Sequence, residues 1–112
     1  LRAVVVTSRE GLHRFSYVGP PSKSGLDPGG ICTDVLSHIL VCDGITKTIQ
    51  MIDRDGHFLS YLLYVQDKPV SLSYDYNTHH LLVGSGNNKL SVYEYINRRT
   101  SLIGESDLLF IV

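Results

Sequence analysis

The sequence predicts an all-β fold, and three observations support this prediction. Short runs rich in β-branched and aromatic residues alternate with gaps rich in glycine, aspartate, asparagine and serine, as expected of strands joined by turns. Apolar and polar residues alternate within several runs, which is the period of a strand. The runs also recur at intervals of about 40 to 45 residues, a spacing typical of the four-stranded antiparallel blades of a β-propeller.

The repeat is visible first in two charged turns, Ser8-Arg9-Glu10-Gly11 and Asp53-Arg54-Asp55-Gly56, whose glycines are 45 residues apart. A second pair of segments, 28–34 and 69–75, opens with proline and closes with aspartate, at an offset of 41 residues. Residues 38–44 then correspond to 80–86, and residues 48–52 to 89–93. These correspondences predict that the same antiparallel unit occurs more than once.

The strands follow from these anchors. We expect two strands at the end of one blade (3–7 and 12–18), four in a complete blade (30–33, 38–42, 48–53 and 57–63) and three in the next (70–74, 80–84 and 89–95). Asp55-Gly56 and Asn87-Asn88 are turn pairs that tolerate positive φ. The predicted propeller region covers residues 1–99. It contains the end of one blade (1–19), a complete blade (26–64) and most of a third (69–99). Residues 100–112 are expected to form a C-terminal tail or, alternatively, a last strand. Sequence outside this chain would supply the rest of the propeller.

Composition excludes several function classes. The formal charge is −1 and charged residues make up 19% of the chain, so no overall basic field attracts nucleic acid. No run reaches the roughly 20 apolar residues of a membrane span. The two cysteines, Cys32 and Cys42, form neither a CxxC pair nor a secreted disulfide framework, which predicts a reducing, cytoplasmic location.

Particular motifs carry a family resemblance over roughly residues 2–99. Residues 28–34 resemble the P-x-G-I-x-x-D opening of the NHL-repeat propellers at the carboxyl end of tripartite-motif (TRIM-NHL) ubiquitin ligases, particularly their large invertebrate groups. Residues 39–43 and 49–59 continue the same repeat. The third repeat departs from it, with Val70-Ser71 for the Gly-Ile step and Gly84-Ser85 where the motif carries aspartate, a variation common in terminal blades.

The resemblance implies a non-catalytic binding platform that recognises a protein partner or ubiquitination substrate. The chain carries no RING or B-box array of cysteine and histidine, so we expect no enzyme activity from this fragment and no cofactor. An RNA-binding propeller in post-transcriptional regulation is the alternative, although the basic residues are scattered and Arg98-Arg99 lies beyond the inner strands. An extracellular structural propeller is a second alternative.

A propeller places the loops between its second and third strands, and those between blades, on one face. Here these loops are 44–47, 86–89, 20–26 and 65–68, and mixed polar side chains with isolated lysines suit a protein ligand. The predicted binding residues are Thr46, Lys47, Asp67, Lys68, Asn87, Asn88 and Lys89.

Other reactive residue types have structural explanations. The histidines (13, 38, 57, 79 and 80) do not cluster in sequence, so no metal site is predicted. The aspartates at positions 27, 34, 43, 53, 55 and 75 recur at strand ends, where carboxylates accept backbone N–H groups, and Ser-Gly pairs lack the context of a catalytic serine. A turn centred near Leu36 pairs Cys32 with Leu40, so free thiols are expected. Tyrosines 61, 64, 74, 76, 93 and 95 would either cover outer strands or stack on bases.

Overall fold

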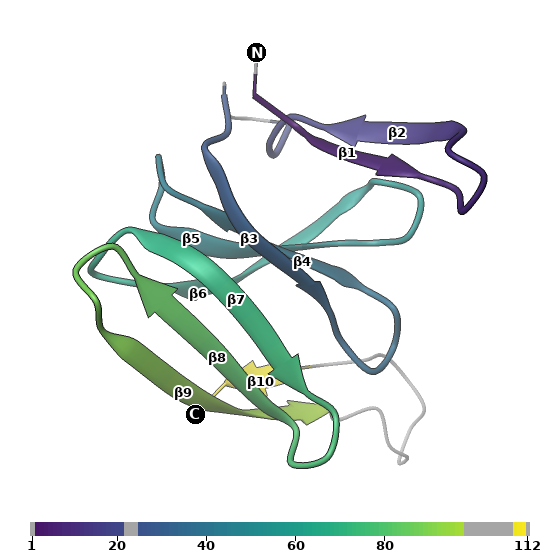
Figure 1. Ribbon diagram of the computed structural model, residues 1–112. Helices are drawn as coiled ribbons and strands as arrows, with labels where there is room; N and C mark the ends of the chain where they lie inside the picture. The colour runs from purple at the N-terminus through teal and green to yellow at the C-terminus, as the bar shows by residue number, and fades with distance from the viewer. Residues whose placement is uncertain (1, 22–24, 98–108, 112) are drawn as a thin grey trace.

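The computed structural model describes residues 2–21, 25–97 and 109–111 (Figure 1). These residues form ten strands in three antiparallel sheets, which confirms the all-β class. The part of the chain that is described contains no helix long and apolar enough to cross a membrane.

Each sheet is formed by consecutive strands of the chain. The first sheet contains β1 (Val4–Thr7) and β2 (His13–Tyr17). The second contains β3 (Pro28–Thr33), β4 (Ile39–Asp43), β5 (Thr48–Ile52) and β6 (Phe58–Tyr64). The third contains β7 (Pro69–Asp75), β8 (His80–Ser85), β9 (Leu90–Asn97) and β10 (Leu109–Ile111). All nine predicted strands are present, with ends shifted by no more than two residues, and β10 pairs with β9.

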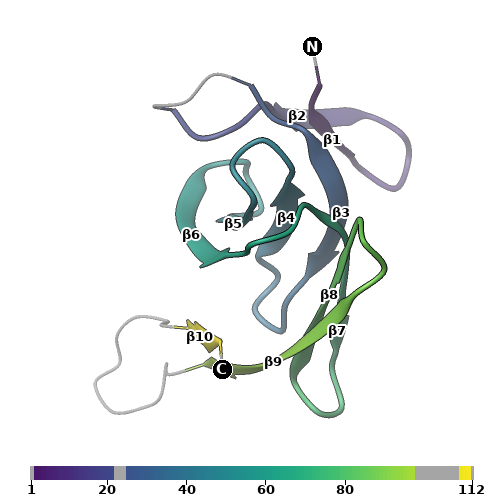
Figure 2. The same cartoon turned by 90° about the vertical axis from the view of Figure 1, so that its left-hand side faces the viewer.

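The second and third sheets meet mainly along their first strands, β3 and β7, which lie side by side (Figures 1 and 2). The last strands of the two sheets, β6 and β10, are also in contact. Glycines of β3 make the contact close. A Cβ atom at Gly30 would lie 2.5 Å from the backbone nitrogen of Leu72 and 2.7 Å from the Cα of Ser71. Only a residue without a side chain therefore allows the two backbones to approach in this way.

The second sheet is buried on both faces, because every residue of β4 and β5 is buried. One face packs on the third sheet through Leu40, Cys42, Ile49 and Met51, which meet Tyr74, Leu81, Val83 and Tyr95. The other face packs on the first sheet and its connection through Ile39, Val41 and Ile52, which meet Val4, Tyr17 and Leu26. Burial on two faces explains the continuous apolar run 39–42 in β4, whereas β5 carries the polar residues Thr48 and Gln50 in the same buried setting.

The third sheet repeats this pattern but leaves one face open. In β5, Ile49 and Met51 pair with Cys42 and Leu40, and at the equivalent positions of β9, Leu90 and Val92 pair with Gly84 and Leu82. Ile49 is fully buried and Met51 is 7% exposed, whereas Leu90 is 64% and Val92 54% exposed. The open face is thus apolar at the same positions that the second sheet uses to bind its neighbour.

Four hairpin turns share one geometry. Each spans five residues and places the fourth residue at positive φ: Ser8–Leu12, Asp34–His38, Asp53–His57 and Ser85–Lys89. At Asp34 the Oδ1 atom accepts the backbone N–H groups of Leu36 and His38, at 2.8 and 2.9 Å. Asp53 forms the same pair of hydrogen bonds. A type I turn followed by a left-handed residue explains this geometry.

The predicted structural aspartates are confirmed at positions 34, 43, 53 and 75, where the carboxylate accepts backbone N–H groups. Asp27 and Asp55 form ion pairs among the described residues, Asp27 with Arg2 and Lys68, and Asp55 with Arg14 at 3.5 Å.

The cysteine register is confirmed, since Cys32 pairs with Leu40 and both thiols are free. Burial raises the pKa of Cys42 to about 11, which keeps this thiol protonated at neutral pH. The tyrosines do not simply cover outer strands. Tyr74 and Tyr95 are buried between the second and third sheets, with ring centroids 5.1 Å apart at 78°. Their rings are therefore unavailable for stacking on bases.

Candidate functional site

The loops predicted for the binding face lie together, and the same hydrogen bond organises them in two sheets. The backbone N–H of Gly44 donates to the carbonyl of Asp27 at 2.8 Å, and that of Gly86 donates to the carbonyl of Lys68 at 3.0 Å. Each bond ties the turn between the second and third strands of a sheet to the segment that enters its first strand. The loops at 20–26, of which 22–24 lie outside the described residues, 44–47, 65–68 and 86–89 thereby form one continuous loop surface.

An ion pair joins the two repeats across this surface. The Nζ atom of Lys68 lies 3.0 Å from Asp27 Oδ2, and Arg2 bonds to the other oxygen of the same carboxylate. The hydrogen bond from Lys68 lowers the pKa of Asp27 below its usual value. Lys68, a predicted binding residue, therefore also holds neighbouring repeats together.

Thr46 supports the loop from within rather than facing a partner. Its hydroxyl donates to Asp43 Oδ2 at 2.7 Å and lies 2.7 Å from the hydroxyl of Thr48. Lys47 is different, because its side chain is exposed while its carbonyl accepts the N–H of Val65 at 2.9 Å. Its ammonium group forms no ion pair with any described residue, so it is free to meet a partner.

The third loop is built around Ser85. Asn88 takes the left-handed conformation with a φ of 67°, and the backbone N–H of Lys89 donates to Ser85 Oγ at 3.3 Å. The Ser85 hydroxyl also contacts the side chain of Asn87. The backbone of this loop is thus fixed, and the exposed side chain of Lys89 extends from a rigid base.

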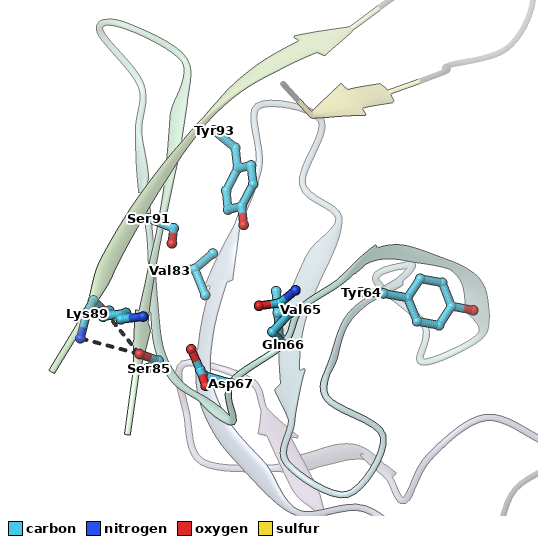
Figure 3. Close-up of a pocket in the computed structure, with 9 residues that line it drawn as sticks. All are labelled: Tyr64, Val65, Gln66, Asp67, Val83, Ser85, Lys89, Ser91 and Tyr93. Atoms are coloured by element: carbon cyan, nitrogen blue, oxygen red, sulfur yellow. Dashed lines mark hydrogen bonds between the residues drawn. The ribbon is translucent and has the colours of Figure 1, made fainter. Parts of the chain in front are cut away.

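A pocket of about 310 Å³ opens between the second and third sheets beside this loop (Figure 3). Two predicted residues line it, Asp67 from the β6–β7 connection and Lys89 from the β8–β9 turn. The remaining lining residues are Tyr64, Val65, Gln66, Val83, Ser85, Ser91 and Tyr93. Val83 is buried and forms part of the floor, while polar groups surround the opening.

Hydroxyl, amide, ammonium and carboxylate groups are therefore gathered around one concave space. Comparisons with family models, curated proteins and solved structures find no match for this chain. The site must be interpreted from its own chemistry. Binding pockets use polar groups to fix the orientation of a ligand, and in this pocket such groups predominate over the apolar floor.

The equivalent position between the first and second sheets is filled. There the buried side chain of Gln50 accepts a hydrogen bond from the hydroxyl of Tyr17 at 2.7 Å. The amide nitrogen of Gln50 donates to Thr48 Oγ1 at 3.0 Å and to Asp43 Oδ2 at 3.2 Å. Burial, with the nearby Tyr61 and Asp43, raises the pKa of Tyr17, so its hydroxyl stays protonated and donates.

Among the described residues, one group has metal-ligand character, namely Asp53, Asp55 and His57, whose ligand atoms lie within 4.8 Å of one another. Asp53 already accepts two turn N–H groups, and its Oδ2 lies 3.0 Å from His57 Nδ1. Asp34 and His38 form the same arrangement at 3.0 Å without a third ligand. The cluster is thus a repeated turn motif, and the absence of a metal site stays a prediction.

Sequence reasoning identified the loops but missed the pocket walls contributed by β8 and β9, including Ser85, Ser91 and Tyr93. The repeat alignment contained a usable signal, because Ser91 stands where the longer Gln50 stands one repeat earlier. A shorter side chain at a position whose equivalent is filled by a buried side chain predicts a vacant volume. The predicted basic pair Arg98-Arg99 lies outside the described residues.

Proposed function

We propose that this chain is part of an NHL-type β-propeller and that its loop surface recognises a protein partner. The propeller assignment is supported by two successive four-stranded meanders whose first strands lie side by side. It is also supported by a middle sheet that is buried on both faces, as a blade between two other blades is. The first sheet would be the last two strands of the preceding blade.

The observation that carries the function is the equivalence of the two loop contacts, Gly44 with Asp27 and Gly86 with Lys68. Each repeat presents the same kind of loop at the same end, on a fixed backbone. Pre-organised loops lose little conformational entropy on binding, which favours recognition. Exposed side chains of both charges, such as Lys47 and Asp67, suit the polar rim of a protein interface.

Protein is favoured over RNA because few cations on this surface are free. Arg2 and Lys68 are both engaged by Asp27, so Lys47 and Lys89 remain as the unpaired lysines of the described loops. RNA binding depends on several phosphate contacts from a basic cluster. With the resemblance to TRIM-NHL proteins, we propose a cytoplasmic, non-catalytic platform that selects substrates or partners for a ubiquitin ligase.

A displayed library of random peptides, selected on the full chain and mapped by amide chemical shifts, tests this proposal. We expect selected peptides to perturb the loop surface, and the double variant Lys47→Glu, Lys89→Glu to weaken them about tenfold. Arg9→Glu, an equal charge reversal in the β1–β2 turn, is the matched control and should change affinity less than about twofold.

Two outcomes would overturn the proposal. Peptides that bind elsewhere, or that are indifferent to the lysine reversals, would remove the loop surface as the recognition site. Tight binding of a defined RNA at physiological salt, abolished by Lys47→Glu and Lys89→Glu, would replace the protein partner with RNA.

A further inference from the structure

The pocket between the second and third sheets has an internal counterpart one repeat earlier. Strand registers establish the equivalence, since Val41 pairs with Gln50 and, in the next sheet, Val83 pairs with Ser91. The position of Gln50 in β5 is therefore the position of Ser91 in β9. Both face the sheet that precedes their own.

The counterpart is occupied by the carboxamide of Gln50. This side chain is fully buried, and its oxygen and nitrogen are both satisfied, by Tyr17 on one side and by Thr48 and Asp43 on the other. A carboxamide requires donors for its oxygen and acceptors for its nitrogen. The space between the first two sheets provides both.

In the next repeat the equivalent space, between the second and third sheets, is left unfilled, because the side chains there are shorter or point elsewhere. Ser91 replaces Gln50, and Ser85 replaces Asp43, because these residues hold equivalent places in the strand registers. Leu26, which is 3% exposed and packs in the core, corresponds to Asp67, which is exposed. In this repeat the same region holds the pocket of about 310 Å³.

The groups around the vacated space still match a carboxamide. Asp67 is an acceptor for an amide nitrogen, and Lys89 and the serine hydroxyls are donors for an amide oxygen. Figure 3 shows Lys89 and Ser91 along one side of the space, with Asp67 and Gln66 from the β6–β7 connection on another. Among the described residues, neither Asp67 nor Lys89 forms an ion pair, so both charges can serve a ligand.

We infer that this pocket takes up the glutamine side chain of a partner peptide. The inference rests on the proposed function, because it assigns one specificity pocket within the proposed loop surface. A glutamate side chain would bring a second negative charge close to Asp67, and a lysine side chain would bring a second positive charge close to Lys89. A leucine would fill the volume but leave the desolvated polar groups without partners.

The experiment follows amide chemical shifts of the full chain during titration with N-acetyl-Gly-Gln-Gly-amide. Matched peptides carry glutamate, leucine or lysine at the central position. We expect the glutamine peptide to shift the amides of Gln66, Ser85 and Ser91 and to bind at least about tenfold more tightly than the others.

The variant Ser91→Gln places in the pocket the side chain that fills its counterpart. It should lower affinity for the glutamine peptide by at least about tenfold, whereas Val92→Gln, on the opposite face of the same strand, should change it less than about twofold. Asp67→Ala, in an exposed connection, is a second variant that loses the amide acceptor and should weaken binding even if Ser91→Gln fails to fold.

Equal affinity for the four peptides would overturn the inference, as would unchanged binding by Ser91→Gln and Asp67→Ala. Library peptides that bind the loop surface but are indifferent to these two substitutions would overturn the glutamine pocket and leave the proposed function standing. Failure of every library peptide to map to the loops is the separate result that removes the proposed function itself.

Discussion

The hydroxyl of Tyr95 in β9 donates a hydrogen bond of 2.8 Å to the Oδ2 atom of Asp34, which begins a turn of the neighbouring sheet. The carboxylate of Asp34 is fully buried, and its other oxygen accepts two backbone N–H groups. Burial and the charge of Asp34 raise the pKa of Tyr95, so the phenol stays protonated. One side chain of the third sheet thus fixes a turn of the second.

Replacement of Tyr95 by phenylalanine should destabilise the chain by about 1 to 3 kcal/mol, because it leaves a buried carboxylate without one of its donors. Chemical denaturation measures the change. Tyr76→Phe is the matched control, since the Tyr76 hydroxyl donates to the carbonyl of Thr33 at 2.8 Å in an exposed setting where water can replace it. Equal losses of unfolding free energy in the two variants would show that the buried hydrogen bond stabilises the fold no more than the exposed one.

Two turn glycines differ in their surroundings and should differ in their tolerance of alanine. Gly11 and Gly56 both have positive φ, 88° and 93°, so alanine at either position should cost about 1 kcal/mol in backbone strain. A Cβ atom at Gly11 would meet nothing within 4 Å, whereas at Gly56 it would lie 2.7 Å from the ring of Phe15.

Gly56→Ala should therefore cost roughly 1 to 2 kcal/mol more than Gly11→Ala, measured as the difference in unfolding free energy. Combining Gly56→Ala with Phe15→Leu should recover part of the excess, because the smaller side chain removes the clash. Additive losses in this double variant would contradict the steric explanation.

The ion pair between Asp27 and Lys68 predicts acid sensitivity. The folded pKa of Asp27 lies below its usual value of 3.8, so the stabilisation is fully present above that value and is lost as the pH falls through the lower folded pKa. Asp27→Asn should lower the thermal unfolding midpoint at pH 7. The difference from wild type should shrink as the pH falls below about 4.

Asp67→Asn is the control for this effect, because Asp67 forms no ion pair among the described residues. Its unfolding midpoint should follow the wild-type pH dependence throughout. A constant difference between Asp27→Asn and wild type at all pH values would show that the carboxylate charge does not stabilise the fold.

The open face of the third sheet predicts self-association. Leu90 and Val92 occupy the positions at which Ile49 and Met51 are buried one repeat earlier, and exposed apolar sheet faces attract partners. Leu90→Lys with Val92→Lys should reduce oligomers in size-exclusion chromatography with light scattering. Leu12→Lys, at an exposed turn position, should not, and a wild-type chain that is monomeric at all concentrations would refute the prediction.

The strands were predictable because their signals are local. Residues 48–52 carry β-branched and apolar side chains between two turns, and the glycine at 56 has the conformation that its turn requires. The cysteine register followed from the position of one turn. Such features depend on neighbours in sequence, so periodicity and turn chemistry were sufficient to locate them.

The pocket and the contacts between sheets were not predictable in the same way. Leu90 and Val92 are as apolar as their buried counterparts, and no local signal shows that their face is open. The ion pair of Asp27 with Lys68 joins residues from two repeats that are far apart in the sequence. Such features depend on how sheets pack on one another, which local sequence patterns do not specify.

The glycines at positions 29 and 30 determine how closely the second and third sheets can approach each other. Because they bring β3 and β7 into backbone contact, the second and third sheets meet closely at their first strands. A side chain at either position would therefore force β3 and β7 apart. Such a displacement would move the loops of the third sheet relative to those of the second, and would alter the spacing of the loop surface that both sheets form.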